Sequence, residues 1–358
     1  MSRFLMIDIG AGTMDILWVD TQNGAHFKAV APSPVRTIAD QINQTQGPLV
    51  VTGVEMGGGS VTRILKERAQ QDEVIISPSA AATLHHDMDR VRSWGLVVAD
   101  EAKLNQAIAD SKFTQVEIGD VEPNRLNRIV SGLGLPLTFD AVTLCGQDHG
   151  VAPKGVSHLD FRHNLFRELL DRSPYPHELL FSSDQIPESF NRLRAMVKTA
   201  ESLDTREVYV MDSGMAAVVG ASQDRHAGGE QPVLVLDIAT SHTVAAVMEK
   251  DALAAMLEYH TADITRQRLD ALLVDLSDGK VNHTQILAEG GHGAYLRKAV
   301  GFSNIESIIA TGPKRRLMVN SQLPITWGAP WGDNMMTGTV GMLESLRRRK
   351  GLPPIAYL

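Results

Sequence analysis

Residues 4–19 and 233–248 repeat one pattern, and this repeat constrains the fold more than any other feature of the chain. In each copy an apolar run enters an Asp, crosses a short turn of small residues, and continues as a second apolar run. The copies read FLMIDIGAGTMDILWV and VLVLDIATSHTVAAVM, with Asp8 and Asp237 at matching places. Each pattern is typical of a β-hairpin. A hairpin that recurs some 229 residues further along the chain predicts a duplicated architecture.

The rest of the chain alternates between strand-like and helix-like patterns. Apolar runs within 47–56, 73–77 and 139–145 are each followed by amphipathic or glycine-rich stretches, and the last helix is expected from about residue 334 to residue 349. This alternation predicts an α/β fold, and a chain of 358 residues is long enough for two domains.

Composition narrows the functional classes. The net charge of -8 argues against non-specific nucleic-acid binding, which needs a concentrated basic face. The single cysteine, Cys145, excludes disulfides and sites built from several thiolates. Asp8 interrupts the first apolar run where a signal peptide would need to continue, and no apolar window is long enough for a membrane span. The chain is therefore predicted to be cytoplasmic, with no membrane partner.

The turn of the first hairpin has the composition of an anion-binding loop. Gly-Ala-Gly-Thr at 10–13 would expose successive backbone N–H groups and leave room for an oxyanion. The neighbouring Asp8 would repel a phosphate, unless Mg²⁺ lies between them, because Mg²⁺ binds one or two carboxylates together with phosphate oxygens. Two facing hairpins could then clamp a polyphosphate, with Asp8 and Asp237 as metal ligands. Alternatively, Asp8 makes only an Asx-type turn bond.

Five motifs, in the expected order, resemble those of the superfamily that contains actin, the sugar kinases and the heat-shock chaperone ATPases. DIGAGTMD is similar to its first phosphate motif, DIATSHT to its second, and IIATGP to its adenosine motif. VYVMDSGMAAVVGAS and APWGDNMMTGTVGML are similar to its two crossing helices. The resemblance implies duplicated ribonuclease-H-like halves, 1–207 plus 333–358 and 225–332, around a cleft for ATP and Mg²⁺. The nucleotide contacts that it implies are Gly10, Ala11, Gly12, Thr13, Thr240, Thr243, Gly290, Gly291, Thr311 and Gly312.

Three positions depart from the superfamily pattern. Ala239 and Ser241 replace glycines of the second phosphate motif, and Pro313 replaces a glycine of the adenosine motif. Each narrows the room for a phosphate or an adenine. Several segments, including CGQDHGVAPKG, also resemble a prokaryotic family labelled as a pyruvate formate-lyase activating enzyme. That chemistry needs a three-cysteine cluster motif, and this chain has one cysteine.

Three polar residues are candidates for catalysis. Gln147 and Asp148 follow a strand expected in the first sheet, so they would lie at its carboxyl end, where ligands bind. Asp148 could accept a proton from a substrate hydroxyl, and Asp212, at a helix start, could orient water. The competing interpretations are a turn stabilised by Asp148 and a helix N-cap at Asp212.

The favoured function is an ATPase whose nucleotide-driven closure acts on a protein partner. A kinase that phosphorylates a hydroxyl or carboxylate of a small molecule is the second hypothesis. A non-catalytic scaffold that keeps only the fold is the third. Whether the chain is an enzyme is left open among the three.

Overall fold

The first six-stranded sheet contains the N-terminal hairpin. A computed structural model describes residues 2–227 and 230–357. The sheet order is β3-β2-β1-β8-β10-β9. Its strands are β1 (Arg3–Ile9), β2 (Thr13–Asp20), β3 (Ala25–Pro32), β8 (Ala141–Gly146), β9 (Phe181–Ser182) and β10 (Val208–Asp212). β1 to β3 form an antiparallel meander, whereas β8 and β10 run parallel to β1.

The second six-stranded sheet has the order β14-β13-β12-β11-β15-β16. Its strands are β11 (Val233–Ile238), β12 (His242–Glu249), β13 (Ala252–His260), β14 (Gly291–Leu296), β15 (Ser307–Thr311) and β16 (Ile325–Trp327). β11 to β13 again form an antiparallel meander, and β15 and β16 are parallel to β11. Five strands of each sheet therefore share one order, with three antiparallel strands followed by two parallel ones.

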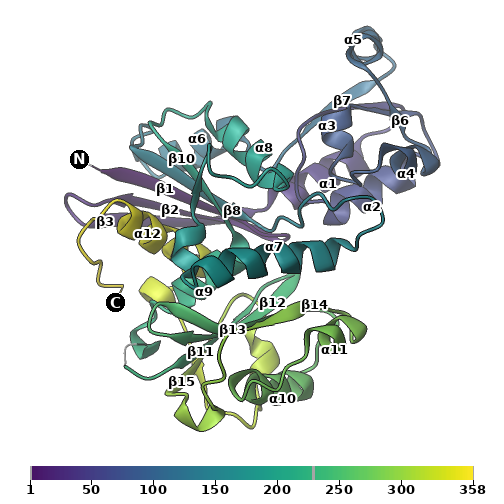
Figure 1. Ribbon diagram of the computed structural model, residues 1–358. Helices are drawn as coiled ribbons and strands as arrows, with labels where there is room; N and C mark the ends of the chain where they lie inside the picture. The colour runs from purple at the N-terminus through teal and green to yellow at the C-terminus, as the bar shows by residue number, and fades with distance from the viewer. Residues whose placement is uncertain (1, 228–229, 358) are drawn as a thin grey trace.

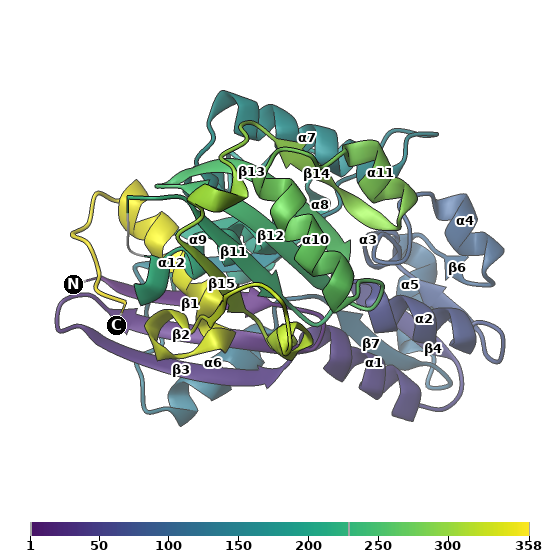
Figure 2. The ribbon, with the colours of Figure 1, turned by 90° about the horizontal axis from the view of Figure 1, so that it is seen from below.

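This shared strand order is that of two ribonuclease-H-like halves, as the repeated hairpin predicted. Figures 1 and 2 show the two sheets on opposite sides of the helices α9 (Ser213–Ala221) and α12 (Thr337–Arg349). The fifth strand of each half, β10 or β16, precedes one of these helices in the chain. The fold class is thus the duplicated fold of the actin-like ATPases. The domain boundaries stay a prediction, and β10 begins one residue after the proposed end of the first half at 207.

A third, four-stranded parallel sheet was not expected from the sequence. Its order is β6-β5-β4-β7, with β4 (Leu49–Gly53), β5 (Val74–Ile76), β6 (Val97–Val98) and β7 (Thr114–Ile118). It lies between β3 and β8 in the chain and has its own hydrophobic cluster. In Figure 1 this unit stands beside the first sheet, at the upper right.

The remaining helices cover the three sheets. Their bounds are α1 (Pro34–Gln44), α2 (Gly59–Arg68), α3 (Pro78–Ala81), α4 (Met88–Ser93), α5 (Glu101–Ala109), α6 (Pro123–Gly132), α7 (His158–Arg172), α8 (Asn191–Ala200), α10 (Arg266–Ser277) and α11 (His283–Ala288). In the described part of the chain, no helix has both the length and the apolar character needed to cross a bilayer.

Glycines allow α9 and α12 to cross at very short range. A Cβ added at Gly220 would lie 1.8 Å from the carbonyl oxygen of Thr337, and one at Gly341 would lie 1.9 Å from that of Ala216. Both obstacles are backbone atoms, which cannot rotate away. The buried faces of both helices complete the core of the first half.

Replacing Gly220 with Ala should therefore separate the two helices and destabilise the protein. We expect Gly220→Ala to lower the free energy of unfolding by about 3 kcal/mol, the upper range for overpacking, as measured by urea unfolding. Gly132→Ala is the control, because a Cβ there meets nothing within 4 Å. Its stability should be unchanged or slightly higher, since Ala favours helix over Gly by about 1 kcal/mol. Equal stability of the two variants would contradict the close crossing.

Candidate functional site

The two hairpin turns face one another across one cavity of about 670 Å³. Each turn is closed by the same bond, from the N–H of Gly10 to the carbonyl of Thr13 and from the N–H of Ala239 to the carbonyl of His242. A Cβ added at Gly12 would lie 3.1 Å from Oγ1 of Thr240. The expectation that the turns oppose each other is confirmed. The matching bonds also align Thr13 of the first half with His242 of the second.

Three carboxylates gather beside these turns. Asp8 and Asp237 occupy equivalent places on β1 and β11 and line the cavity. Asp15 on β2 is directly opposite Asp8 in the strand register and lines the same cavity. Sequence reasoning missed Asp15, although a charged residue inside an apolar strand was a usable signal.

Burial and mutual repulsion make these groups reluctant to ionise. Burial raises the pKa of Asp237 to about 6, against a bond from Thr311 that lowers it. Burial also raises the pKa of Asp8 to about 6, and Asp237 contributes in the same direction. Asp15 has its pKa raised to about 8, by burial first and then by Asp8. Oδ1 of Asp15 is buried without a hydrogen-bond partner among the described residues. A divalent cation that binds oxygen ligands fits this donor set, because its charge would offset the repulsion.

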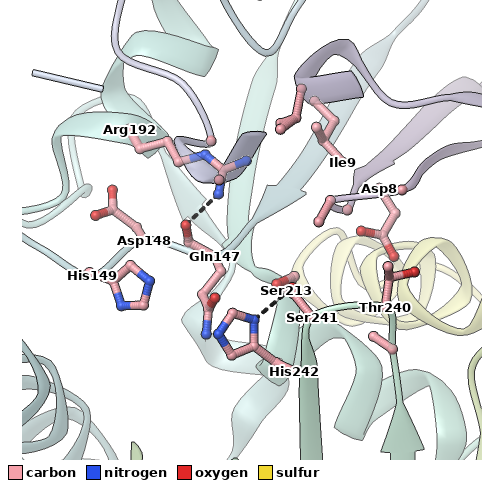
Figure 3. A pocket seen from close by; sticks show the side chains of 18 of the residues that line it. Asp8, Ile9, Gln147, Asp148, His149, Arg192, Ser213, Thr240, Ser241 and His242 are labelled. Atoms are coloured by element: carbon pink, nitrogen blue, oxygen red, sulfur yellow. Dashed lines mark hydrogen bonds between the residues drawn. The ribbon is translucent and has the colours of Figure 1, made fainter. Parts of the chain in front are cut away.

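Positive charge is scarce around the cavity. Among the described residues that line it, Arg192 is the only Lys or Arg. Its guanidinium is bonded to Asp120 at 2.7 and 3.0 Å. It also donates to the backbone carbonyl of Gln147 at 2.6 Å, as Figure 3 shows. Polyphosphate binding here would depend on a metal ion and backbone N–H groups more than on basic side chains.

Asp148 lines the cavity, but both its carboxylate oxygens are occupied. Oδ1 accepts the N–H of Gly150 at 2.8 Å, and Oδ2 accepts the N–H of Leu193, in the first turn of α8, at 3.0 Å. Figure 3 shows Asp148 and Asp8 at opposite sides of the site. This geometry matches the structural interpretation of Asp148, as a turn and helix cap. Its role as a proton acceptor stays a prediction.

Asp212 does not line the cavity, and its role in orienting water stays a prediction. It is 1% exposed and caps α9, with Oδ1 accepting the N–H of Gly214 at 3.0 Å. Arg162 of α7 binds it through two bonds of 2.8 and 3.3 Å. The same guanidinium reaches Glu258 of β13 at 3.3 Å. Asp212 thus orients an arginine that joins the first half to the second.

Other predicted contacts divide between the cavity and the protein interior. The cavity is lined by Gly10, Ala11, Gly12, Thr13, Gln147, Thr240 and Gly312. Thr243 is buried against Thr261, and Thr311 donates to Asp237 at 2.8 Å. Neither residue lines the cavity, and neither do Gly290 and Gly291. The next residue along the chain, His292 of β14, does line the cavity.

Four histidines also line the cavity, and sequence reasoning missed two of them, His242 and His260. His149, His242, His260 and His292 all line it, close to Glu258. Burial lowers the pKa of both His149 and His242 to about 3. The charge of Arg162 lowers the pKa of His149 further, whereas the charge of Glu258 acts to raise the pKa of His242. A separate group near the glycine segment 57–59 contains Glu55, whose carboxylate lies 2.9 Å from Nε2 of His86.

The strand order and the paired turns define the fold that actin, the sugar kinases and the heat-shock chaperone ATPases share. The chain belongs to the family described as "Putative pyruvate format-lyase activating enzyme (DUF1786)", which matches residues 56–317. The label's cluster chemistry is not available to this chain, whose one cysteine is buried. A search of curated proteins finds no match.

Solved structures with similar folds were also found. One is a protein with an actin-like ATPase fold and unknown function from Bacteroides thetaiotaomicron, at 8% identity over 88% of this chain and 86% of that one, with a TM-score of 0.33. Another is the "PilM-PilN type IV pilus biogenesis complex", at 13% identity over 98% of both chains, with a TM-score of 0.39. A third is a "putative 2-dehydro-3-deoxygalactonokinase protein" from Sinorhizobium meliloti, at 9% identity over 99% of both chains, with a TM-score of 0.38.

The raised pKa of Asp148 predicts a specific pH dependence of stability. Burial raises this pKa from 3.8 to about 6. Because the folded state holds the proton more tightly, the contribution of Asp148 to stability is fully present below about pH 4 and is lost as the pH rises through 6. The loss amounts to about 3 kcal/mol at most.

Asp148→Asn removes this titration. We expect the stability of Asp148→Asn, relative to the wild type, to increase between about pH 4 and pH 7, whatever its constant offset from altered capping. Urea unfolding at several pH values measures the difference. A difference that stays constant with pH would show that Asp148 ionises as readily in the folded chain as in the unfolded one.

Proposed function

We propose that this protein binds ATP with Mg²⁺ in the central cavity and hydrolyses it, and that the nucleotide controls the relative position of the two halves. The observation that carries the proposal is the pair of equivalent turns, each with its own Asp, on opposite sides of one cavity. A cavity of about 670 Å³ is within the usual range for small-molecule sites.

The residues present fit Mg²⁺ and phosphate. Asp8 and Asp237 would hold the ion, directly or through water, with Asp15 as a third acidic neighbour. A Cβ at position 338 would lie 2.1 Å from Oδ2 of Asp8, so a larger residue there would have to displace this carboxylate. Bound Mg²⁺ would neutralise the phosphate charge, and the N–H groups of the two turns would hold the phosphate oxygens.

The departures from the superfamily pattern leave the turns accessible. Ala239, Thr240 and Ser241 all line the cavity, so the side chains that replace glycine do not close it. On the adenosine side Gly312 remains, with a φ of 87° and its Cβ position 2.5 Å from the carbonyl oxygen of Ile238. Only glycine fits there, and Pro313 follows it at the edge of the cavity.

The connections between the two halves would allow a change in their relative position. The halves are joined by the glycine-mediated crossing of α9 and α12 and by the Arg162 bonds to Asp212 and Glu258. A nucleotide that binds both turns would pull the sheets together about these connections. A protein partner that recognises one of the two arrangements would then respond to the nucleotide.

A small-molecule kinase is the second candidate, because the cavity continues beyond the phosphate turns. It reaches Glu55, the glycine segment 57–59 and His86, which belong to the unit of the four-stranded sheet, and this leaves room for a phosphate acceptor. Glu55 paired with His86 is a further group that could take a proton from a hydroxyl.

If Asp237 is a Mg²⁺ ligand, its loss should weaken nucleotide binding only when Mg²⁺ is present. We expect Asp237→Asn to weaken Mg²⁺·ATP binding by about 10-fold or more, about 1.4 kcal/mol, while metal-free ATP binds as in the wild type or better. Titration calorimetry with and without Mg²⁺ measures both. The exposed Asp89→Asn serves as the control and should change neither. Equal losses with and without the metal would exclude Asp237 as a ligand.

The rate of ATP turnover distinguishes the candidates. A partner-dependent ATPase should turn over ATP slowly, at a rate that a pool of small metabolites does not change. Acceleration by one metabolite, with phosphate recovered on it, would establish the kinase instead. Failure of the wild-type protein to bind ATP at all would overturn the proposal and favour the scaffold.

A further inference from the structure

Three histidines from adjacent strands converge at one end of the cavity. His242 begins β12, and its register partner is His260, the last residue of β13. His292 is the second residue of β14. The β13–β14 register shifts between Glu258 and Tyr259, so that Tyr259 pairs with Gly291 while Glu258 pairs with Gly293. Such a bulge redirects a side chain, and His292 thereby joins the other two histidines.

The nitrogen atoms of these three rings are close enough to share one ion. One ligand atom from each of the three lies within 4.8 Å of the others. Nε2 of His292 is 2.9 Å from Nε2 of His260. Nε2 of His242 is buried and has no hydrogen-bond partner in the described part of the chain. A buried nitrogen without a partner is costly, and a metal ion would supply its missing partner.

The other nitrogen of two rings faces a neighbouring polar group. Nδ1 of His242 is hydrogen-bonded to Oγ of Ser241 at 2.9 Å. Nδ1 of His292 lies 3.3 Å from a carboxylate oxygen of Glu258, close to it but without a hydrogen bond. Glu258 is itself held by Arg162 and by the side-chain amide of Gln147. Metal-binding histidines are commonly oriented in this way, by a carboxylate or hydroxyl on the nitrogen that does not bind the metal.

We propose that His242, His260 and His292 bind a divalent first-row transition metal ion through their Nε2 atoms. Imidazole nitrogens select zinc, cobalt, iron or nickel over Mg²⁺, which prefers oxygen. Three protein ligands leave one position open, as in catalytic zinc sites. All three rings line the cavity, so that position faces its interior.

This site is separate in chemistry from the carboxylates of Asp8, Asp15 and Asp237. It nevertheless adjoins the second hairpin turn, because His242 is the residue that closes that turn. A metal ion there would lie next to the place where the proposed function puts phosphate. The inference does not depend on nucleotide binding and is tested without nucleotide.

The test uses the untagged full-length protein, stripped of metal by a chelator and titrated with Co²⁺ and then with Zn²⁺. We expect Co²⁺ to bind with a stoichiometry of one, with visible d–d absorption of nitrogen-ligated cobalt that Zn²⁺ displaces. His260→Ala and His292→Ala should each weaken Co²⁺ binding by more than about 100-fold. Loss of a residue that only hydrogen-bonds to a ligand already lowers metal affinity by about 10- to 100-fold.

Two further variants keep the test decisive if a ligand variant fails to fold. Ser241→Ala retains all three rings and should weaken Co²⁺ binding about 10-fold without changing the stoichiometry. The control is His163→Ala. His163 stacks on His283 with ring centroids 3.7 Å apart and does not line the central cavity, so its loss should leave cobalt binding intact. Absence of stoichiometric binding, or equal losses in His163→Ala and His260→Ala, would overturn the proposal.

Discussion

The close crossing of α9 and α12 is the constraint on which the rest of the structure depends. Because Gly220 and Gly341 bring backbone against backbone, the two helices act as one buried element between the sheets. The same helix α12 passes Asp8 at Gly338, so helix packing and the position of the first carboxylate are set together. The facing of the two turns follows from this geometry, since each turn belongs to a sheet that packs on one side of the crossing.

The cavity between the sheets has two chemically different ends. One end carries carboxylates whose pKa values are raised by burial and by one another, which is unfavourable without a cation. The other carries imidazoles such as His242, whose pKa is lowered by burial. Next to them, Arg162 holds the pKa of Glu258 below its usual value, although burial acts in the opposite direction. Oxygen ligands and nitrogen ligands therefore line one cavity. A nucleotide with its magnesium ion suits the first set, and a transition metal suits the second.

The sequence predicted the fold because its strongest signals are local. Asp8 and Asp237 lie in hairpins whose pattern is complete within 16 residues, and the repeat of that pattern reveals the duplication. The four-stranded sheet was missed because an apolar run in the sequence predicts a strand but does not indicate to which sheet that strand belongs. Asp15 was available from sequence, as a charge in an apolar strand. The cluster of three histidines was not, since its members lie in separate segments and a β-bulge brings His292 to the other two.

The two halves share a backbone but have diverged in chemistry, and the divergence occurs at the turns. When the two hairpins are aligned on their matching turn bonds, Thr13 corresponds to His242 and Asp15 to Val244. At these two places the first half has a hydroxyl and a second carboxylate, whereas the second half has an imidazole and an apolar side chain. A symmetric clamp would need neither difference. The asymmetry follows naturally if the first turn serves a magnesium-bound phosphate and the second also borders a nitrogen-ligated metal ion.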